Sequence, residues 1–320
     1  MEHKTHKLLS KLLLLLFLFT VMFFLFSCTS GNNSSYEQVY SGNEGIVIQF
    51  LPDSPRSVYN QGEFINLQIE AINKGRFAYP AGIIALDGFD KQSLFFSSLQ
   101  KQLPQLEAKT ENNPSGGSNF VQFDESLPVK VPYGDKYSTT IQATSCYQYQ
   151  TIAQVNACII PDISDIAKQK NVCSPRVITL SSQGAPVAVT QVEERVAKDI
   201  VQFLITVQNI GDGRVIQPDK LDQCPYLLKP KDIDHIVVHA AIDTLGEAEC
   251  GSNSLDKESN NIVRLFDNKG LIVCKFITRP DISSYETPLR ITLDYGYSSS
   301  IQKNIEIFNP EFTGREIKNG

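Results

Sequence analysis

The sequence lacks several residue types on which common kinds of site depend. It contains no Trp, and both of its Met residues, Met1 and Met22, fall within the N-terminal segment that ends at Ser27. Beyond that segment only two histidines remain, and no two cysteines have C-x-x-C spacing. These shortages argue against a zinc site built from Cys and His. They also leave the remainder without two residue types that often anchor or adapt a binding surface.

Basic charge is in short supply as well. Without the three lysines and one glutamate of residues 1–27, the chain has 26 cations and 34 anions, a net charge of −8. Nucleic-acid binding depends on a surplus of Lys and Arg that neutralises phosphates. We therefore expect no nucleic-acid partner.

No motif of a familiar catalytic or cofactor site occurs in the chain. There is no G-x-S-x-G elbow, glycine-rich phosphate loop or EF-hand string. His235 and His239 lie four residues apart, but they lack the glutamate of H-E-x-x-H, and Ile236–Val238 between them favours an exposed strand over a metal pair. We expect no cofactor, no metal and no catalytic residue, although a catalytic triad built from distant residues stays open.

The first residues have the pattern of an export signal. Lys4, Lys7 and Lys11 precede an apolar segment that runs from Leu12 to Phe26, with Thr20 as its one interruption. A basic region, an apolar region and a small residue at position 27 are typical of a secretory signal. Residues 1–27 are therefore predicted to be a signal peptide or a membrane-anchor helix.

Two modes of anchoring fit this segment. Leu25-Phe26-Ser27-Cys28 resembles a lipobox, in which the chain is cut before the cysteine, so Cys28 is a predicted lipid-attachment site. Alternatively, Leu8–Phe26 stays uncleaved, since it approaches the ~20 residues that span a bilayer. Both place the protein on the extracytoplasmic face of the cell membrane. Residues 28–43 are rich in Ser, Asn and Gly and are predicted to form a flexible tether.

Six cysteines remain when Cys28 is assigned to the anchor. They are Cys146, Cys158, Cys173, Cys224, Cys250 and Cys274. An even number in an exported chain predicts three disulfides, but six cysteines allow fifteen pairings.

Alternating apolar residues predict antiparallel strands. Leu67, Ile69 and Ala71 share one face of Phe64–Lys74, which ends in a turn, and the pattern recurs in the second half of the chain, before Asn209. Further strands are predicted over Gly45–Leu51, Gly82–Leu86, Ile233–Leu245 and Asn261–Phe276, the last turning at Asp267–Gly270, and one amphipathic helix over Asp90–Leu103.

A longer repeat closes each half. Tyr137–Asp162 aligns without gaps on Tyr285–Pro310. The eight identities are Tyr137/Tyr285, Thr139/Thr287, Thr144/Thr292, Tyr147/Tyr295, Tyr149/Tyr297, Gln154/Gln302, Asn156/Asn304 and Ile159/Ile307. We interpret the chain as a tandem duplication. It predicts one β-sandwich over residues 44–160, a linker over 161–184, a second sandwich over 185–308 and a polar tail over 309–320.

The parity of the first repeat predicts one disulfide. If the runs on either side of Ile152 form a hairpin, burial of the apolar residues places Tyr149 opposite Val155 and Cys146 opposite Cys158. We therefore predict a Cys146–Cys158 bridge, worth about 3 kcal/mol in a loop-entropy model. The alternative pairs each elsewhere, for instance Cys158 with Cys173. The pairing of Cys173, Cys224, Cys250 and Cys274 stays open.

The same hairpin in the second repeat would place Asp294 opposite Glu306. Opposed like charges are destabilising, and a cation such as calcium could relieve them. Simple hydration is the plainer alternative, because two carboxylates fall short of the six to eight oxygens that calcium takes. Tyr147, Tyr149, Tyr295 and Tyr297 could form an aromatic ligand platform, but they occur at the apolar parity, which favours core packing.

Two features resemble known families. The V-x-V-x-N-x-G type strands at Ile69–Gly75 and Ile205–Gly211 resemble CARDB and related Ig-like modules of extracellular prokaryotic proteins. Cys146–Thr151, Ala157–Ile159 and Gly184–Thr190 are similar to a family of uncharacterised archaeal surface lipoproteins. The resemblance implies a β-sandwich fold and a surface location, and it carries no known activity or binding residues. Phe26 departs from the usual lipobox.

The sequence therefore predicts an all-β protein of two tandem Ig-like antiparallel sandwiches behind an N-terminal signal or anchor helix. The expected function is non-catalytic: an adhesion or envelope-assembly component whose loops or sheet edges bind a protein or an envelope polymer. The alternatives are an accessory ligand-binding subunit of a membrane complex and a hydrolase with an unrecognised site. A pocket with convergent polar groups would favour these alternatives.

Overall fold

The computed structural model describes residues 41–78, 82–161, 172–251, 261–279 and 283–312. The predicted signal or anchor, the lipid site at Cys28 and almost all of the tether lie outside these residues, as do 162–171 of the linker and 313–320 of the tail. Within the described part of the chain, no helix combines the length and the apolar character needed to cross a membrane.

The described chain is almost entirely β-structure, as the sequence predicts. Its elements are β1 (Ile46–Phe50), β2 (Val58–Asn60), β3 (Asn66–Asn73), β4 (Gly82–Asp87), β5 (Phe95–Phe96), β6 (Gln100–Leu103), β7 (Ser118–Leu127), β8 (Lys136–Ile159), β9 (Val177–Thr179), β10 (Val187–Ala197), β11 (Ile200–Asn209), β12 (Arg214–Ile216), the 3-10 helix η1 (Pro218–Gln223), β13 (His235–Ile242), β14 (Gly246–Glu247), β15 (Glu249–Gly251), β16 (Ile262–Arg264), β17 (Lys269–Ile277) and β18 (Tyr285–Phe308). All strand pairs are antiparallel except β2 with β18.

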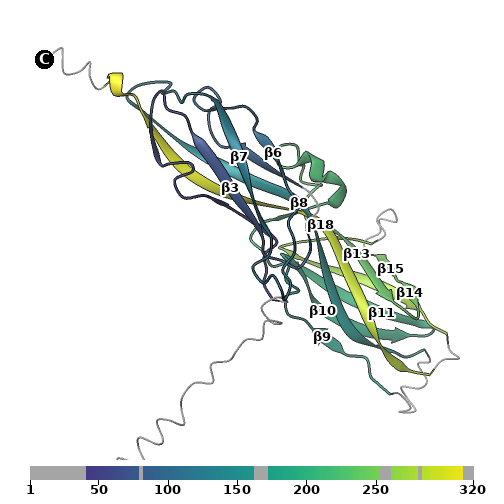
Figure 1. Ribbon diagram of the computed structural model, residues 1–320. Coiled ribbons are helices and arrows are strands. Elements are labelled where there is room, and N and C mark those ends of the chain that lie inside the picture. The colour runs from purple at the N-terminus through teal and green to yellow at the C-terminus, as the bar shows by residue number, and fades with distance from the viewer. Residues whose placement is uncertain (1–40, 79–81, 162–171, 252–260, 280–282, 313–320) are drawn as a thin grey trace, which may run out of the picture. The chain divides into compact units, whose positions relative to one another are not determined.

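Two long strands, β8 and β18, organise the fold (Figure 1). Each has 24 residues, and they pair with each other from Lys136↔Phe308 to Tyr285↔Ile159. They form the centre of a nine-stranded sheet. A four-stranded sheet, β1-β3-β7-β5, packs over one half of it, and a five-stranded sheet, β15-β17-β11-β10-β9, packs over the other. We call these halves the first lobe and the second lobe.

The hairpin predicted around Ile152 is wrong. β8 runs straight through this residue, and its alternation of buried and exposed residues continues unbroken, with Tyr149, Ala153 and Val155 buried and Gln154 exposed. A continuous strand and a hairpin bury the same alternate residues here, so burial alone does not distinguish them. β8 contains no Gly, Pro or Asn-Gly that would favour a turn. The second half of β8 therefore lies in the second lobe, so the lobes do not divide at residue 160.

The two repeats pair with each other around a pseudo-two-fold axis. Gln148 and its counterpart in the second repeat, Gly296, are partners in the ladder, so every other repeat position is related across the same point. Tyr147 lies opposite Tyr297, and Tyr149 lies opposite Tyr295. Because the odd residues of β8 are buried in both lobes, both covering sheets lie on one face of the long strands. One continuous hydrophobic core fills the two lobes.

The strands predicted from the sequence are present as β1, β3, β4, β11, β13, β16 and β17, but the helix over Asp90–Leu103 is wrong. β5 and β6 occupy this segment, and β6 pairs with β4 from Gly82↔Leu103 onwards. Pairing with a sheet edge outweighs a local four-residue spacing of apolar residues. The predicted turn between β16 and β17 is present, with positive φ at Asp267 and Asn268.

The disulfide prediction fails with the hairpin. In one continuous strand Cys146 and Cys158 lie twelve residues apart, roughly 40 Å, and cannot be joined. The three bridges are Cys146–Cys224, Cys158–Cys173 and Cys250–Cys274, with S–S distances of 2.08, 1.97 and 2.10 Å. The alternative pairing of Cys158 is therefore the correct one. Three disulfides are typical of an oxidising, extracytoplasmic environment.

Asp294 and Glu306 do not face each other either, so the premise of a shared cation is wrong. Both lie on β18, twelve residues apart. Gln150 Nε2 donates to Asp294 Oδ1 at 2.7 Å, and Lys136 Nζ lies 2.6 Å from Glu306 Oε1. Among the described residues there is no group of three potential metal ligands.

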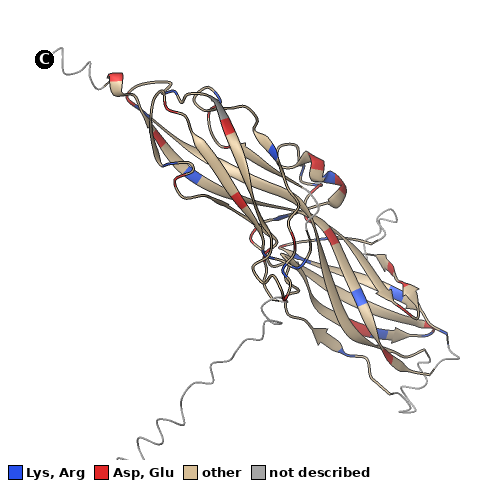
Figure 2. Cartoon of the chain, in the orientation of Figure 1, with Lys and Arg blue, Asp and Glu red and all other residues tan. Residues whose placement is uncertain are grey.

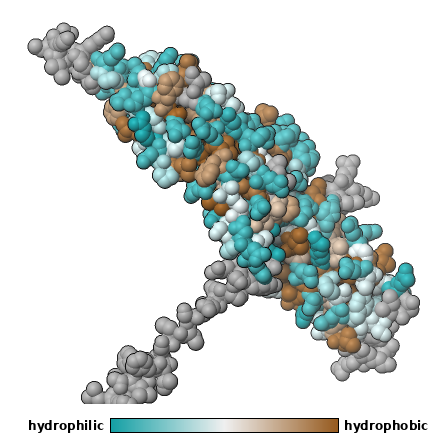
Figure 3. All heavy atoms as spheres, viewed as in Figure 1, coloured by the Kyte–Doolittle hydropathy of each residue, from teal (hydrophilic) through white to brown (hydrophobic). Residues whose placement is uncertain are grey.

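Acidic and basic residues are interspersed over both lobes (Figure 2). Hydrophobic and hydrophilic residues are similarly mixed on the face shown in Figure 3. On the face shown, charge and hydropathy therefore single out no binding surface.

Candidate functional site

The four repeat tyrosines lie in the core beside the pseudo-two-fold axis. Tyr147, Tyr149, Tyr295 and Tyr297 are at most 3% exposed, and neighbouring ring centroids are 5.7 to 6.3 Å apart. Burial raises the pKa of all four hydroxyls, that of Tyr297 to about 12, so they stay protonated at neutral pH. Core packing is confirmed, and the tyrosines are not available as a ligand platform.

These tyrosines explain the N-x-G motif that each repeat carries. Tyr149 Oη donates to Asn73 Oδ1 at 3.0 Å, and Tyr297 Oη donates to Asn209 Oδ1 at 3.1 Å. A Cβ on Gly75 would collide with Tyr149 Oη, and one on Gly211 would lie 2.5 Å from Tyr297 Oη. In each repeat the Asn side chain therefore accepts a hydrogen bond from a buried tyrosine hydroxyl, and the Gly leaves room for that hydroxyl.

The second half of β8 forms a free edge of the nine-stranded sheet. β4 pairs with β8 only from Gln142 to Tyr147, and no described strand pairs with the residues after Gln148 on the side away from β18. The N–H of Cys158 and the C=O of Asn156 both bond on this side. Backbone groups alternate along a strand, so those of Gln150, Ile152 and Gln154 face the same side.

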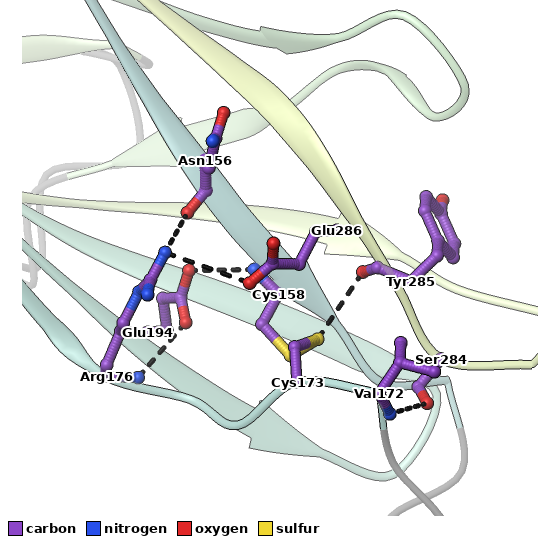
Figure 4. The surroundings of a disulfide bond; sticks show 9 residues. All are labelled: Asn156, Cys158, Val172, Cys173, Arg176, Glu194, Ser284, Tyr285 and Glu286. Carbon is purple, nitrogen blue, oxygen red and sulfur yellow. Dashed lines mark hydrogen bonds and ion pairs between the residues drawn. A yellow bond between two sulfur atoms is a disulfide. The ribbon is translucent and has the colours of Figure 1, made fainter.

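Side chains close the far end of this edge (Figure 4). Arg176 Nη2 donates to Asn156 O at 3.2 Å, and Glu194 Oε1 accepts the N–H of Cys158 at 2.9 Å. The Cys158–Cys173 bridge ties the linker to the same point. Edge pairing therefore stops at Asn156, and the open stretch is Gln150–Gln154.

Glu194 is the buried carboxylate of this cap. Its other oxygen, Oε2, accepts the N–H of Arg176 at 3.1 Å, and the residue is 5% exposed. Burial raises the pKa of Glu194, and the two N–H donors and the Arg176 charge oppose that rise without cancelling it. The Glu194 carboxylate therefore accepts two backbone hydrogen bonds at a site where burial disfavours its charged form.

A groove of about 700 Å³ runs along the open stretch, which we call the β8 groove. Its lining consists of Arg76, Phe77, Gln150, Ile152, Ala153, Gln154, Thr179, Leu180, Ser181, Ser182 and Gln183. Amides and hydroxyls converge there with apolar side chains, and Ile152 is 40% exposed. Chemically, the groove offers hydrogen bonds and apolar contact, and its one charged side chain is a guanidinium.

The pseudo-two-fold axis relates this groove to a smaller one on β18. The β18 groove measures about 190 Å³, and its lining includes Asp212, Gly213, Ser299, Ser300 and Ile301. Ser300 is the counterpart of Ile152, and Asp212 stands where the β8 groove has Arg76. β12 and β2 pair with β18 on either side of it, at Gly296–Ser298 and Glu306–Phe308.

The two histidines lie on β13, as predicted, and take no part in the β8 groove. His235 Nδ1 contacts Ile233 O at 2.7 Å. His239 Nε2 lies 4.0 Å from Asp294 Oδ2, at a partly exposed position. The groove residues themselves were not singled out from the sequence. The available signal was a run of amides around Ile152 in a strand with a single charge.

Comparisons with known proteins add no identity. No family model matches the chain, and no curated protein matches it. Among solved structures, the crystal structure of the CupB6 tip adhesin from Pseudomonas aeruginosa is similar at 9% sequence identity, covering 84% of this chain and 96% of that chain with a TM-score of 0.16. A likeness at this TM-score carries no argument. The resemblance to archaeal surface lipoproteins stays a prediction.

Proposed function

We propose that the protein is a non-catalytic, membrane-tethered component of the cell surface that binds a partner along the open edge of β8. One observation carries this proposal: the backbone groups of Gln150, Ile152 and Gln154 face a groove and have no hydrogen-bond partner among the described residues. An unpaired edge is a template for another strand, and strand addition is a recurrent mode of protein recognition.

Three further features support this function. The disulfides suit an extracytoplasmic location, and the basic and apolar start of the chain has the pattern of an export signal. The Cys158–Cys173 bridge and the Glu194 cap hold the end of the edge in place without covering Gln150–Gln154. The end of β8 is therefore fixed at Cys158, while Gln150–Gln154 stays accessible to a partner strand.

One observation favours a second candidate, an accessory ligand-binding subunit of a membrane complex. The amides of Gln150, Gln154 and Gln183 converge on a groove whose volume lies within the range of small-molecule sites. Gln183, however, already bonds both the N–H and the C=O of Val189, at 2.9 and 3.1 Å. Fewer polar groups are thus free for a small ligand than the lining suggests.

The test is site-specific photo-crosslinking on intact cells that make the full chain. A photoreactive residue replaces Ile152, and a matched variant carries it at Ser300, the counterpart on β18. We expect a protein adduct from position 152 and little from position 300, with the adduct identified by mass spectrometry. Absence of any adduct at 152, or equal labelling at 300, would contradict binding at this edge.

A further inference from the structure

The outward side chains along the open edge of β8 form a palindrome. From Gln148 to Asn156 the solvent-facing positions are Gln148, Gln150, Ile152, Gln154 and Asn156. Two carboxamides therefore stand on each side of a central, exposed isoleucine. A strand that pairs antiparallel with a copy of itself about Ile152 places Gln150 opposite Gln154 and Gln148 opposite Asn156.

The backbone fits the same register. The outward N–H and C=O groups of β8 belong to even-numbered residues, as the bonds of Asn156 and Cys158 show. In an antiparallel pair, residues whose backbone groups face the partner exchange both hydrogen bonds. Self-pairing about Ile152 therefore satisfies the backbone of Ile152, Gln150 and Gln154 on both copies, and no unpaired group remains between them.

The side chains are complementary in that register as well. Gln150 Nε2 donates to Asp294 Oδ1 within its own chain, which leaves Gln150 Oε1 to accept from Gln154 of the second copy. At the centre, two Ile152 side chains meet and lose exposed apolar surface. The β8 groove shows that no described residue fills the space beside this edge.

We propose that a second copy of this chain occupies the edge, with the two β8 strands antiparallel across a two-fold axis at Ile152. The interface is isologous, because the same patch serves both subunits. This inference rests on the proposed function and names its partner. The molecule already contains the same kind of contact, since β8 pairs with its own repeat, β18, about Gln148 and Gly296.

β8 lacks the features that normally keep edges from pairing. Charged side chains and prolines protect exposed edges against strand addition. Lys136 is the one charged residue among the 24 of β8, and it lies at the opposite end from the groove. β18 carries five charges, and β13, β12 and β2 cover parts of its outer edge. The stretch of β18 between β12 and β2, with which no described strand pairs on the outer edge, contains Lys303, whereas Gln148–Asn156 of β8 contains no charged residue.

The experiment uses the full chain, purified in detergent. Ile152→Cys and Ser300→Cys variants are treated with a short bismaleimide, and the wild type reports any reaction of native cysteines. We expect a covalent dimer from Ile152→Cys and none from Ser300→Cys or the wild type. Equal dimer from both variants, or none from Ile152→Cys, would overturn the register.

Sedimentation gives an independent reading. Ile152→Lys places two like charges opposite each other and should weaken dimerisation roughly tenfold or more, whereas Ser300→Lys should leave it unchanged. A wild-type chain that stays monomeric at about 100 μM would overturn the self-association. If that monomer still crosslinks to a different protein from position 152 on cells, the proposed function stands without a second copy. If no adduct forms at all, both proposals fail.

Discussion

β8 and β18 contain the two copies of the sequence repeat, have the same length and bury the same face, yet their outer edges differ. The buried tyrosines are kept in both, because each hydroxyl is held in the core by hydrogen bonds. At the outward positions around the groove, Gln148, Gln150 and Ile152 of β8 are replaced by Gly296, Ser298 and Ser300 on β18, whereas Gln154 and Asn156 are kept as Gln302 and Asn304. Packing constrains the inner face of both strands, whereas the outward positions and the edge are free to differ.

The largest expected effect concerns the Cys146–Cys224 disulfide, which has no counterpart on β18. Cys146 bonds to Cys224 across 78 residues, whereas its counterpart on β18 is Asp294. The loop-entropy model gives about 4.5 kcal/mol for this bridge and about 3 kcal/mol for Cys158–Cys173. Denaturant unfolding of the Cys146→Ala/Cys224→Ala and Cys158→Ala/Cys173→Ala double variants should show this order. A smaller loss from the first pair would contradict the loop-entropy order.

The second prediction concerns the close approach of Gly75 and Gly211 to the buried tyrosine hydroxyls, one in each repeat. Gly75→Ala and Gly211→Ala each place a Cβ against a buried tyrosine hydroxyl and nearby backbone oxygens. We expect each to lower the free energy of unfolding by about 3 kcal/mol, with Gly75→Ala the worse because its contact is closer. Gly251→Ala is the control, since nothing lies within 4 Å of its Cβ position. Unfolding curves close to wild type for both repeat variants would contradict this close approach.

Much of this fold could be predicted from the residues themselves. Period-2 alternation located β3 and β11 because each has one buried face, and the tyrosines lie in the core as the alternation of buried and exposed positions indicates. The gap-free repeat also identified the two segments that later proved to be partners. These features are local, or follow from comparing two stretches of the chain.

The pairing of those segments could not be predicted in the same way. A hairpin at Ile152 and a straight strand bury the same alternate residues, so burial does not distinguish them. The choice depends on β18, the pairing partner of β8 in the other half of the chain. The wrong disulfide followed directly from that choice. The candidate site was missed for a related reason. The amides around Ile152 are visible in the sequence, but an edge is open only relative to the order of strands.

The third prediction uses the tyrosines to test how tightly the lobes are joined. Their pKa values are raised in the folded state, whereas an unfolded tyrosine has a pKa of about 10. Their contribution to stability is thus complete below pH ~10 and is lost as pH rises further, by about 1.4 kcal/mol per pH unit for each protonated hydroxyl. In tyrosinate absorbance these four groups should ionise late, Tyr297 before the other three.

The control for this pH dependence is Tyr133→Phe, at a residue 88% exposed, which should leave the alkaline transition unchanged. Tyr297→Phe should remove one late-ionising group and shift the transition to higher pH. Early and independent ionisation of all the tyrosines would mean that the cluster at the pseudo-two-fold axis is open to solvent.

The smallest expected effect is at the cap that ends the open edge of β8. Burial raises the pKa of Glu194, so its ionisation costs stability in the folded state, and the contribution of this group falls as pH rises through the raised value. Glu194→Gln removes that pH dependence and also one of the two N–H acceptors, for a net loss of about 1 kcal/mol near neutral pH. The advantage of wild type over the variant should therefore be larger at acid pH and shrink to this value as pH increases to neutral. β18 offers the contrast, because Glu306, the counterpart of Cys158, donates its N–H to Ser57 O instead of to a carboxylate. Unfolding of wild type and Glu194→Gln with the same dependence on pH would contradict this role of the Glu194 carboxylate.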